Sequence, residues 1–91
     1  MFKTLEELIT VIRQRKGFSS EKSYTNKLLN NKKLNVEKVK EEIKELINAI
    51  EKDTNKVHEA ADVLYHLMVL LEANGIKIED VMDELKKRQK K

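Results

Sequence analysis

An almost wholly apolar run, VLYHLMVLL at residues 63–71, constrains the fold more than any other feature, because 38% of the chain is charged. As a helix, this run would be apolar on nearly every side, which is typical of burial on two faces. The chain has 91 residues, and so short a chain struggles to cover both faces alone. We therefore predict a bundle that is completed by dimerisation, or by a larger homo-oligomer. A single bundle with this helix at its centre is the alternative.

The rest of the chain has the composition and spacing of an all-α protein. It contains no proline and two glycines, and its apolar residues recur three and four positions apart, which predicts amphipathic helices. Thr4, a serine within residues 18–31, and Asn35 are the expected N-caps, and Asn74-Gly75 is the expected stop of the apolar helix. We predict one domain, a four- to five-helix bundle. The expected helices cover approximately residues 4–16, a short segment within 18–31, residues 35–52, residues 55–73, and a last segment that contains Ile78, Val81, Met82 and Leu85.

Composition excludes several classes of protein. The chain has no cysteine, which excludes disulfide frameworks, thiolate nucleophiles and thiolate metal sites. The apolar run is too short to span a bilayer, and acidic residues stand near the N-terminus where a signal peptide would be apolar. The net charge is +3, and the basic tail KKRQKK is more typical of a solvated helix end than of a nucleic-acid contact. We expect a soluble, cytoplasmic protein with neither a membrane nor a nucleic-acid partner.

Two pairs of acidic residues, each spaced by one helical turn, give the clearest indication of function. Glu42 and Glu45 border the apolar stripe of KVKEEIKEL, and Glu59 and Asp62 repeat the spacing on the next helix. Residues 46–58 are enough to finish one helix, turn and begin an antiparallel one. Facing carboxylates repel one another unless a cation lies between them. Because oxygen-only ligands favour hard divalent ions, we predict a Mg²⁺ site open to a polyphosphate, with Mn²⁺ as a possible substitute.

A solvated acidic face is the alternative interpretation, in which Glu42 pairs with Lys38 one turn earlier. Glu41 lies further round the same helix, where it could reach a second ion through water. His66 lies one turn beyond Asp62 on nearly the same line, so it could hold a carboxylate or contact a phosphate. A core histidine satisfied by a neighbour is the other interpretation, and we favour a supporting or structural role.

The pattern E-x-x-E, a short gap and E-x-x-D resembles the signature of the all-α, MazG-like nucleotide pyrophosphatase superfamily. Within it, the chain is similar to the phosphoribosyl-ATP pyrophosphohydrolase family, on SYTNKLL, KVKEEIKEL, EAADVLYHLMVLL and GIKIEDVMDELKKR. The resemblance covers nearly the whole chain, and SYT-x-K-L is its most specific element. Lys22 and Lys40 depart from the pattern, because the family usually has glycine at both positions.

The resemblance implies that phosphoribosyl-ATP and water give phosphoribosyl-AMP and pyrophosphate, the second step of histidine biosynthesis. The four acidic residues would hold Mg²⁺, and Glu45 would also take a proton from the attacking water. The resemblance also agrees with a homodimer. The candidates for substrate contact are Lys27 and Lys38 for the phosphates, and Arg13, Tyr24 and Thr25 for the rest of the nucleotide.

Two other functions fit the residues. Lys22 and Lys40 favour a related pyrophosphatase that acts on ordinary or damaged nucleoside triphosphates. The basic tail favours a non-catalytic module for helical dimerisation or nucleic-acid binding. An assay of pyrophosphate release with both kinds of substrate separates all three.

Overall fold

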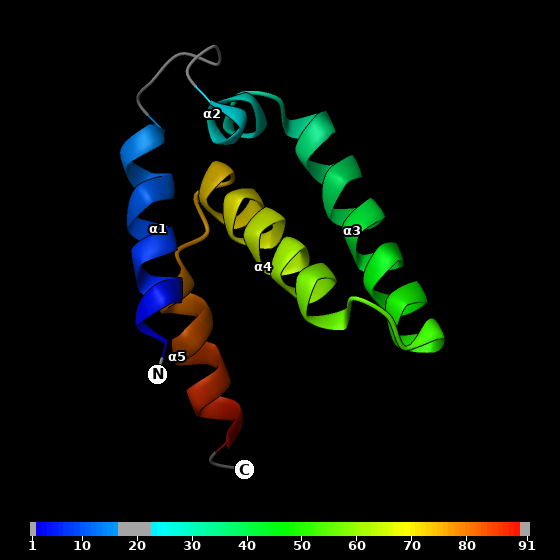
Figure 1. The fold of residues 1–91 in the computed structure, drawn as a ribbon. Helices are drawn as coiled ribbons and strands as arrows, with labels where there is room; N and C mark the ends of the chain where they lie inside the picture. The colour runs from blue at the N-terminus through cyan, green and yellow to red at the C-terminus, as the bar shows by residue number, and fades with distance from the viewer. Residues whose placement is uncertain (1, 17–22, 90–91) are drawn as a thin grey trace.

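The computed structural model describes residues 2–16 and 23–89. Within these ranges it contains five helices and no strand, which confirms the predicted all-α bundle. No helix in this part of the chain is long and apolar enough to cross a membrane. The helices are α1 (Lys3–Arg15), α2 (Tyr24–Leu29), α3 (Lys32–Lys52), α4 (Lys56–Ala73) and α5 (Ile78–Gln89) (Figure 1).

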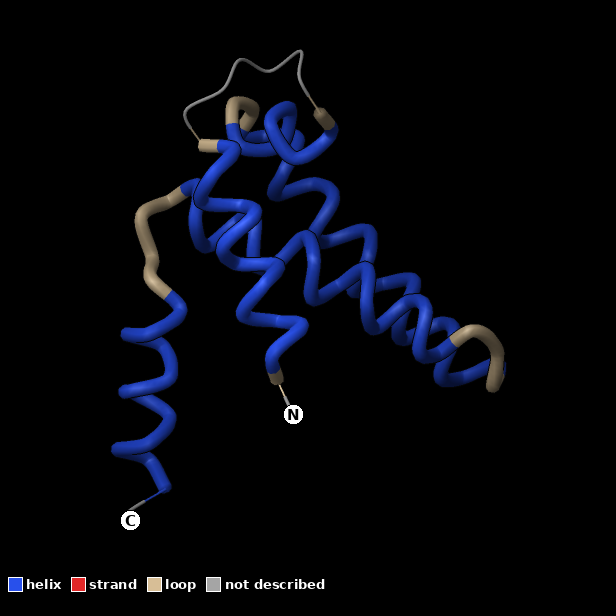
Figure 2. The backbone as a smooth tube through the Cα atoms, turned by 60° about the vertical axis from the view of Figure 1, so that its left-hand side comes forward, coloured by secondary structure: helices blue, strands red, loops and turns tan. Residues whose placement is uncertain are grey.

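Helix α4 lies at the centre of the fold, and each of the other four helices contacts it. Its most extensive packing is against α3, which runs antiparallel to it as the other arm of a long hairpin (Figure 1). The short α2 crosses one end of this hairpin, and α1 covers another side of α4. Figure 2 shows α5 standing apart from the hairpin, joined to it by the turn that follows α4.

The hydrophobic core lies where three helices meet. Ile9 and Ile12 of α1, Leu28 of α2, and Met68 and Val69 of α4 are buried against one another. The core therefore covers the C-terminal half of α4, and the N-terminal half packs mainly against α3. The second acidic motif lies in that N-terminal half, where α4 faces α3.

A sharp turn sets the register of the α3–α4 hairpin. Asp53 and Asn55 adopt left-handed backbone conformations, with φ of 56° and 45°, which Asp and Asn tolerate better than most residues. The backbone N–H of Thr54 donates to the Ala49 carbonyl at 3.0 Å and closes the last turn of α3. This turn brings the acidic residues of α3 opposite those of α4.

Two of the expected helix ends are confirmed. Ser23 caps α2, because its hydroxyl accepts a hydrogen bond from the Asn26 N–H at 3.2 Å. Helix α4 stops at Asn74, and Gly75 follows with φ of 71°. There the Ile76 N–H donates to the Leu71 carbonyl at 2.9 Å, satisfying a carbonyl at the helix end.

Two expected N-caps are wrong. Helix α3 begins one turn earlier than expected, with Asn31 accepting from the Leu34 N–H at 3.1 Å, and Asn35 is buried inside the helix. Both asparagines are good caps, but the earlier start lets Leu34 pack against the core. Helix α1 begins at Lys3, before Thr4, and the N-cap position is held by Phe2 without a side-chain hydrogen bond.

Several large apolar side chains of the hairpin lie on the surface. The most exposed is Val57, at 85% of its maximum. A second layer would remove this surface from water and stabilise the fold. Dimerisation itself stays a prediction. The other exposed members are Ile43, Ile47 and Ile50 of α3 and Leu64 of α4.

Candidate metal and nucleotide site

The hairpin brings the predicted acidic residues together from its two arms. Carboxylate oxygens of Glu42, Glu45 and Glu59 lie within 4.8 Å of one another. Oxygens of Glu59 and Asp62 lie within 4.8 Å of each other and of a ring nitrogen of His58. Glu59 therefore belongs to both groups and links Asp62 to the two α3 carboxylates.

Two of these carboxylates carry oxygens that lack a partner. The Oε2 atoms of Glu42 and Glu59 are buried and accept no hydrogen bond from the part of the chain that the structure describes. No Lys or Arg within the described ranges forms an ion pair with any of the four acids; their single such contact is His58 Nε2 to Asp62 Oδ2, at 3.4 Å. Leaving a buried carboxylate oxygen without a partner is costly, and a divalent cation would remove that cost. The donor set, made only of oxygens, fits Mg²⁺ or Mn²⁺.

The electrostatics of the site follow from this crowding. Burial raises the pKa of Glu42, and the neighbouring Glu45 raises it further, whereas His66 lowers it. Burial likewise raises the pKa of Glu59, with Glu45 adding to the effect and His58 opposing it. The carboxylates therefore resist ionising together in the absence of a cation.

Lys38 does not neutralise this cluster. Its Nζ lies 3.5 Å from Glu41 Oε2, so the lysine pairs with the outer, exposed glutamate and not with Glu42. The solvated alternative, in which Lys38 balances Glu42, is therefore not what the structure shows. Glu41 itself lies outside both groups of converging carboxylates.

His66 ties α2 to the turn of α4 that carries Asp62. Its Nδ1 donates to the Asp62 carbonyl at 2.8 Å, since a carbonyl oxygen can only accept. In the neutral ring, Nε2 then accepts from the Tyr24 hydroxyl at 2.9 Å. The side chain is buried, and a supporting role fits these contacts better than direct contact with a phosphate.

A second hydrogen bond joins α2 to α4 at the neighbouring positions. The hydroxyls of Thr25 and Tyr65 lie 2.5 Å apart, so the predicted substrate contact Thr25 is already engaged with α4. Tyr65 was not anticipated, because the sequence does not reveal which part of α4 meets α2. The contact of His58 with Asp62 was also missed, although its i, i+4 spacing on a helix indicates it.

Arg13 lies elsewhere. Its guanidinium donates to Glu72 at 3.0 Å and to the two oxygens of Glu79 at 3.0 and 2.6 Å, joining α1, α4 and α5. Glu72 stands ten residues beyond Asp62, or about 15 Å along a helix axis. The structure therefore does not bring Arg13 to the four acidic residues of the hairpin.

The remaining predicted contact is Lys27, and Lys22 and Lys40 are the two departures from the family pattern. Lys27 is exposed in the last turn of α2. Lys40 is exposed on α3, where it lines a shallow hollow of about 520 Å³. Lys22 lies outside the described residues. Lysines 27 and 40 are therefore both accessible to a ligand from solvent.

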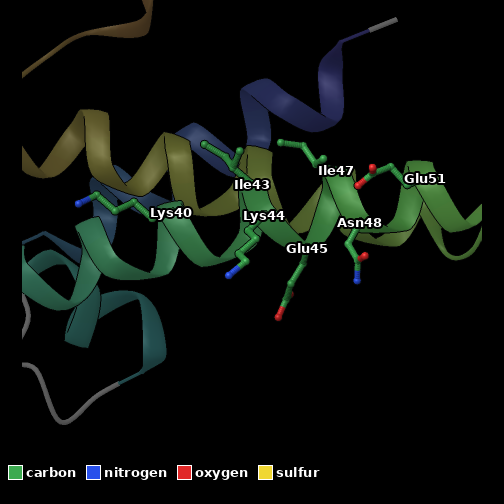
Figure 3. A pocket seen from close by; sticks show the side chains of 7 residues that line it. All are labelled: Lys40, Ile43, Lys44, Glu45, Ile47, Asn48 and Glu51. Atoms are coloured by element: carbon green, nitrogen blue, oxygen red, sulfur yellow. The ribbon is translucent and has the colours of Figure 1, made fainter.

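The hollow beside Lys40 is the outer face of one helix and not a cleft between elements. Figure 3 shows Lys44, Glu45 and Asn48 leaving α3 on one side, and Ile43 and Ile47 leaving it on the other. All of its lining residues belong to α3. The apolar side chains and Glu45 thus occupy different sides of the helix.

Comparison with known proteins identifies the family. A sequence profile described as phosphoribosyl-ATP pyrophosphohydrolase matches residues 5–89. A phosphoribosyl-ATP pyrophosphatase of Clostridium novyi is 45% identical over 96% of this chain and 82% of its own length. One of Methanoculleus marisnigri is 42% identical over 94% of each chain. A histidine biosynthesis bifunctional protein of Pyrococcus furiosus is 42% identical over 94% of this chain and 41% of its own length. The chain belongs to the phosphoribosyl-ATP pyrophosphohydrolase family.

Proposed function

We propose that this protein hydrolyses phosphoribosyl-ATP to phosphoribosyl-AMP and pyrophosphate, in histidine biosynthesis, with Mg²⁺ held by the acidic hairpin. Water adds across the α–β phosphoanhydride: its oxygen forms the new bond to phosphorus, and the bond to the bridging oxygen breaks. The observation that carries the proposal is the pair of buried, unpartnered oxygens of Glu42 and Glu59, in a chain that matches the family over nearly its whole length.

The four carboxylates would have two roles, metal binding and acceptance of a proton. Mg²⁺, when bound, would neutralise the triphosphate and lower the pKa of a water. Glu42 and Glu59 are the ligands with the strongest support, because each carries a buried Oε2 atom without a hydrogen-bond partner in the described part of the chain. Asp62 holds the outer end of the cluster, beside His58. Glu45 is exposed while its oxygen lies near those of Glu42 and Glu59, so it is placed to accept the proton of the attacking water.

The substrate would be held by lysines at the edge of the cluster. Lys38 is the stronger candidate for a phosphate contact, because among the described residues its one ion-pair partner is the exposed Glu41, at 3.5 Å. Lys27 reaches solvent from α2, which is docked beside the same turn of α4. In this proposal Thr25 and Arg13 act by holding α2 and α5, because their polar groups are already engaged.

We also propose that the protein works as a homodimer in the cytoplasm. A second copy would cover Ile43 and Ile47 of α3, which leave the helix on the side opposite Glu45 (Figure 3). A dimer of this kind leaves the carboxylates accessible to the substrate. The cytoplasmic location is supported by the charge of the substrate, because a triphosphate does not cross a membrane unaided.

Pyrophosphate release from phosphoribosyl-ATP, with Mg²⁺, tests the proposal. We expect Asp62→Asn to lower kcat/KM by about 100-fold, equivalent to the loss of roughly 2.7 kcal/mol of transition-state stabilisation. Asp83→Asn is the matched control: it is the same change at an exposed position of α5, and it should leave the rate unaltered. A strong preference for ordinary nucleoside triphosphates would contradict the substrate. Full activity of the Asp62 variant would contradict the site.

A further inference from the structure

Tyr24 is an exposed aromatic residue in a chain that has few of them. The sequence contains two tyrosines, two phenylalanines and no tryptophan. Tyr24 is 45% exposed, although its hydroxyl is fixed by His66 at 2.9 Å. Its polar end is therefore engaged, while much of its ring lies open to solvent.

The ring is held rigidly. It stacks against Tyr65 with ring centroids 6.2 Å apart and planes inclined by 19°, and it lies nearly perpendicular to the His66 ring, at 78° with centroids 5.8 Å apart. The hydrogen bond between Thr25 and Tyr65 fixes the same two helices from the next position. One face of Tyr24 is thus turned to Tyr65, and a rigid ring loses little entropy when a ligand covers the other face.

Tyr24 also lies beside the proposed metal and phosphate site. Its hydrogen-bonding partner His66 donates to the carbonyl of Asp62. Lys38 and Glu42 are close enough to act on the pKa of Tyr24, which burial raises and Lys38 lowers. A nucleotide whose phosphates reach Lys38 would therefore have its base or sugar near this ring.

We propose that the outer face of the Tyr24 ring stacks on the nucleobase of the substrate, forming a base–Tyr24–Tyr65 stack. The inference rests on the proposed function, since it needs the triphosphate to lie at the hairpin. Stacking of a base on an aromatic ring contributes strongly to nucleotide binding and needs no hydrogen bond from the ring. Tyr24 would thus bind the base through its ring, while its hydroxyl positions α2.

Two ligands distinguish the contribution of the base to binding from that of the phosphates. We would measure, by calorimetry with Mg²⁺, the affinities of α,β-methylene-ATP, which resists cleavage between the α and β phosphates, and of inorganic triphosphate. In the native protein the nucleotide should bind more tightly. Tyr24→Leu should weaken binding of the nucleotide by about tenfold and leave binding of inorganic triphosphate within about twofold.

Three controls test the alternatives. Tyr24→Phe keeps the ring and loses the hydroxyl, so it should bind the nucleotide within about threefold of the native protein. Phe2→Leu changes the N-cap residue of α1, and Figure 1 shows that this end of α1 lies away from α2, so the variant should bind both ligands normally. With no tryptophan in the chain, tyrosine fluorescence should fall on addition of the nucleotide and not of triphosphate. Melting curves would show whether each variant is folded.

Any other result contradicts the stacking of the substrate base on Tyr24. Equal weakening for both ligands would show that Tyr24 only supports the structure, and no weakening would show that the ring does not touch the base. If the native protein binds the nucleotide no more tightly than triphosphate, the stack is wrong while the phosphate site stands. If it binds neither ligand, the proposed function is wrong, and the stack with it. Should Tyr24→Leu fail to fold, the fluorescence change of the native protein and the affinity of Tyr24→Phe decide.

Discussion

Buried carboxylates occur at two places in this molecule, and their surroundings differ. Glu72, at the C-terminal end of α4, is paired with Arg13 at 2.9 Å and with Lys16 at 3.7 Å. Glu42, on the hairpin, is also buried, but it has no such cationic partner within residues 2–16 and 23–89. The first arrangement is complete within the protein and joins α1, α4 and α5. The second is incomplete, and what it lacks is positive charge.

The two clusters also shift pKa values in opposite directions. Hydrogen bonds from Arg13 lower the pKa of Glu79 to about 2, whereas burial raises the pKa of Glu42. Burial alone therefore does not mark a functional carboxylate. A buried carboxylate whose neighbours are other carboxylates is the better candidate for a functional group, because the protein supplies no compensating charge of its own.

Removing one hairpin carboxylate should have the largest effect. We expect Glu42→Gln to lower pyrophosphate release by about 100-fold or more. In the absence of metal, the same variant should be more stable than the native protein, by on the order of 1 kcal/mol, because an unpaired buried charge is gone. Activity assays and denaturant titrations measure the two effects.

Glu37→Gln is the matched control, since Glu37 is an exposed glutamate of the same helix. It should change neither quantity. A loss of stability in metal-free Glu42→Gln would contradict the view that this carboxylate is strained, even if activity were lost.

Mg²⁺ should stabilise the hairpin and not the Arg13 cluster. At a concentration 100 times its Kd, the ion should add about 2.7 kcal/mol to the free energy of unfolding, because it binds the folded state. Melting temperature against Mg²⁺ concentration measures this. Glu72→Gln should lower the starting temperature and keep the shift, whereas Glu42→Gln should lose most of it. An equal shift in both variants would place the ion elsewhere.

Breaking the Arg13 cluster should affect stability and spare catalysis. Arg13→Met keeps the length of the side chain and removes both ion pairs, so we expect the melting temperature to fall by about 5 °C. The KM for phosphoribosyl-ATP should stay within about twofold, because the guanidinium is engaged with Glu72 and Glu79. Arg88→Met, which removes an exposed pair within α5, is the control. A large rise in KM without a change in melting temperature would indicate that Arg13 contacts the substrate.

The sequence predicted those features that depend on neighbours along one helix. Apolar spacing located the helices, and the i, i+3 spacing of the acids identified both halves of the candidate site, because a short turn leaves two adjacent helices few ways to pack. It did not predict that Arg13 meets Glu72, since the pair is 59 positions apart and depends on which faces of α1 and α4 meet.

The sequence also did not decide between two equivalent ion-pair partners or between two equivalent N-caps. Lys38 has glutamates three and four positions ahead, and both spacings allow an ion pair; the structure selects Glu41, because Glu42 faces inward. Asn31 and Asn35 are equally good caps by type, and only the packing of Leu34 against the core decides between them.

The pH dependence of stability should separate the two clusters most finely. In metal-free protein, Glu42 and Glu59 have pKa values raised above the ordinary 4.5. Between pH 4.5 and those raised pKa values, the folded state therefore binds more protons than the unfolded state. Stability should therefore rise as the pH falls from neutrality towards 4.5. Below that, Glu79 has the opposite sign: its pKa is about 2, so its contribution is lost as the pH falls from 4.5 towards 2.

Melting temperature against pH should thus pass through a maximum in mildly acidic solution. Mg²⁺ should flatten the neutral side of the curve, because the cation replaces the protons that relieve the hairpin, and Glu42→Gln should do the same without metal. Arg13→Met should flatten the acidic side alone, because Glu79 then titrates near its ordinary value in both states. A metal-free protein that loses stability steadily from pH 7 to pH 5 would contradict the contrast between the clusters, because the hairpin carboxylates would then favour the ionised form.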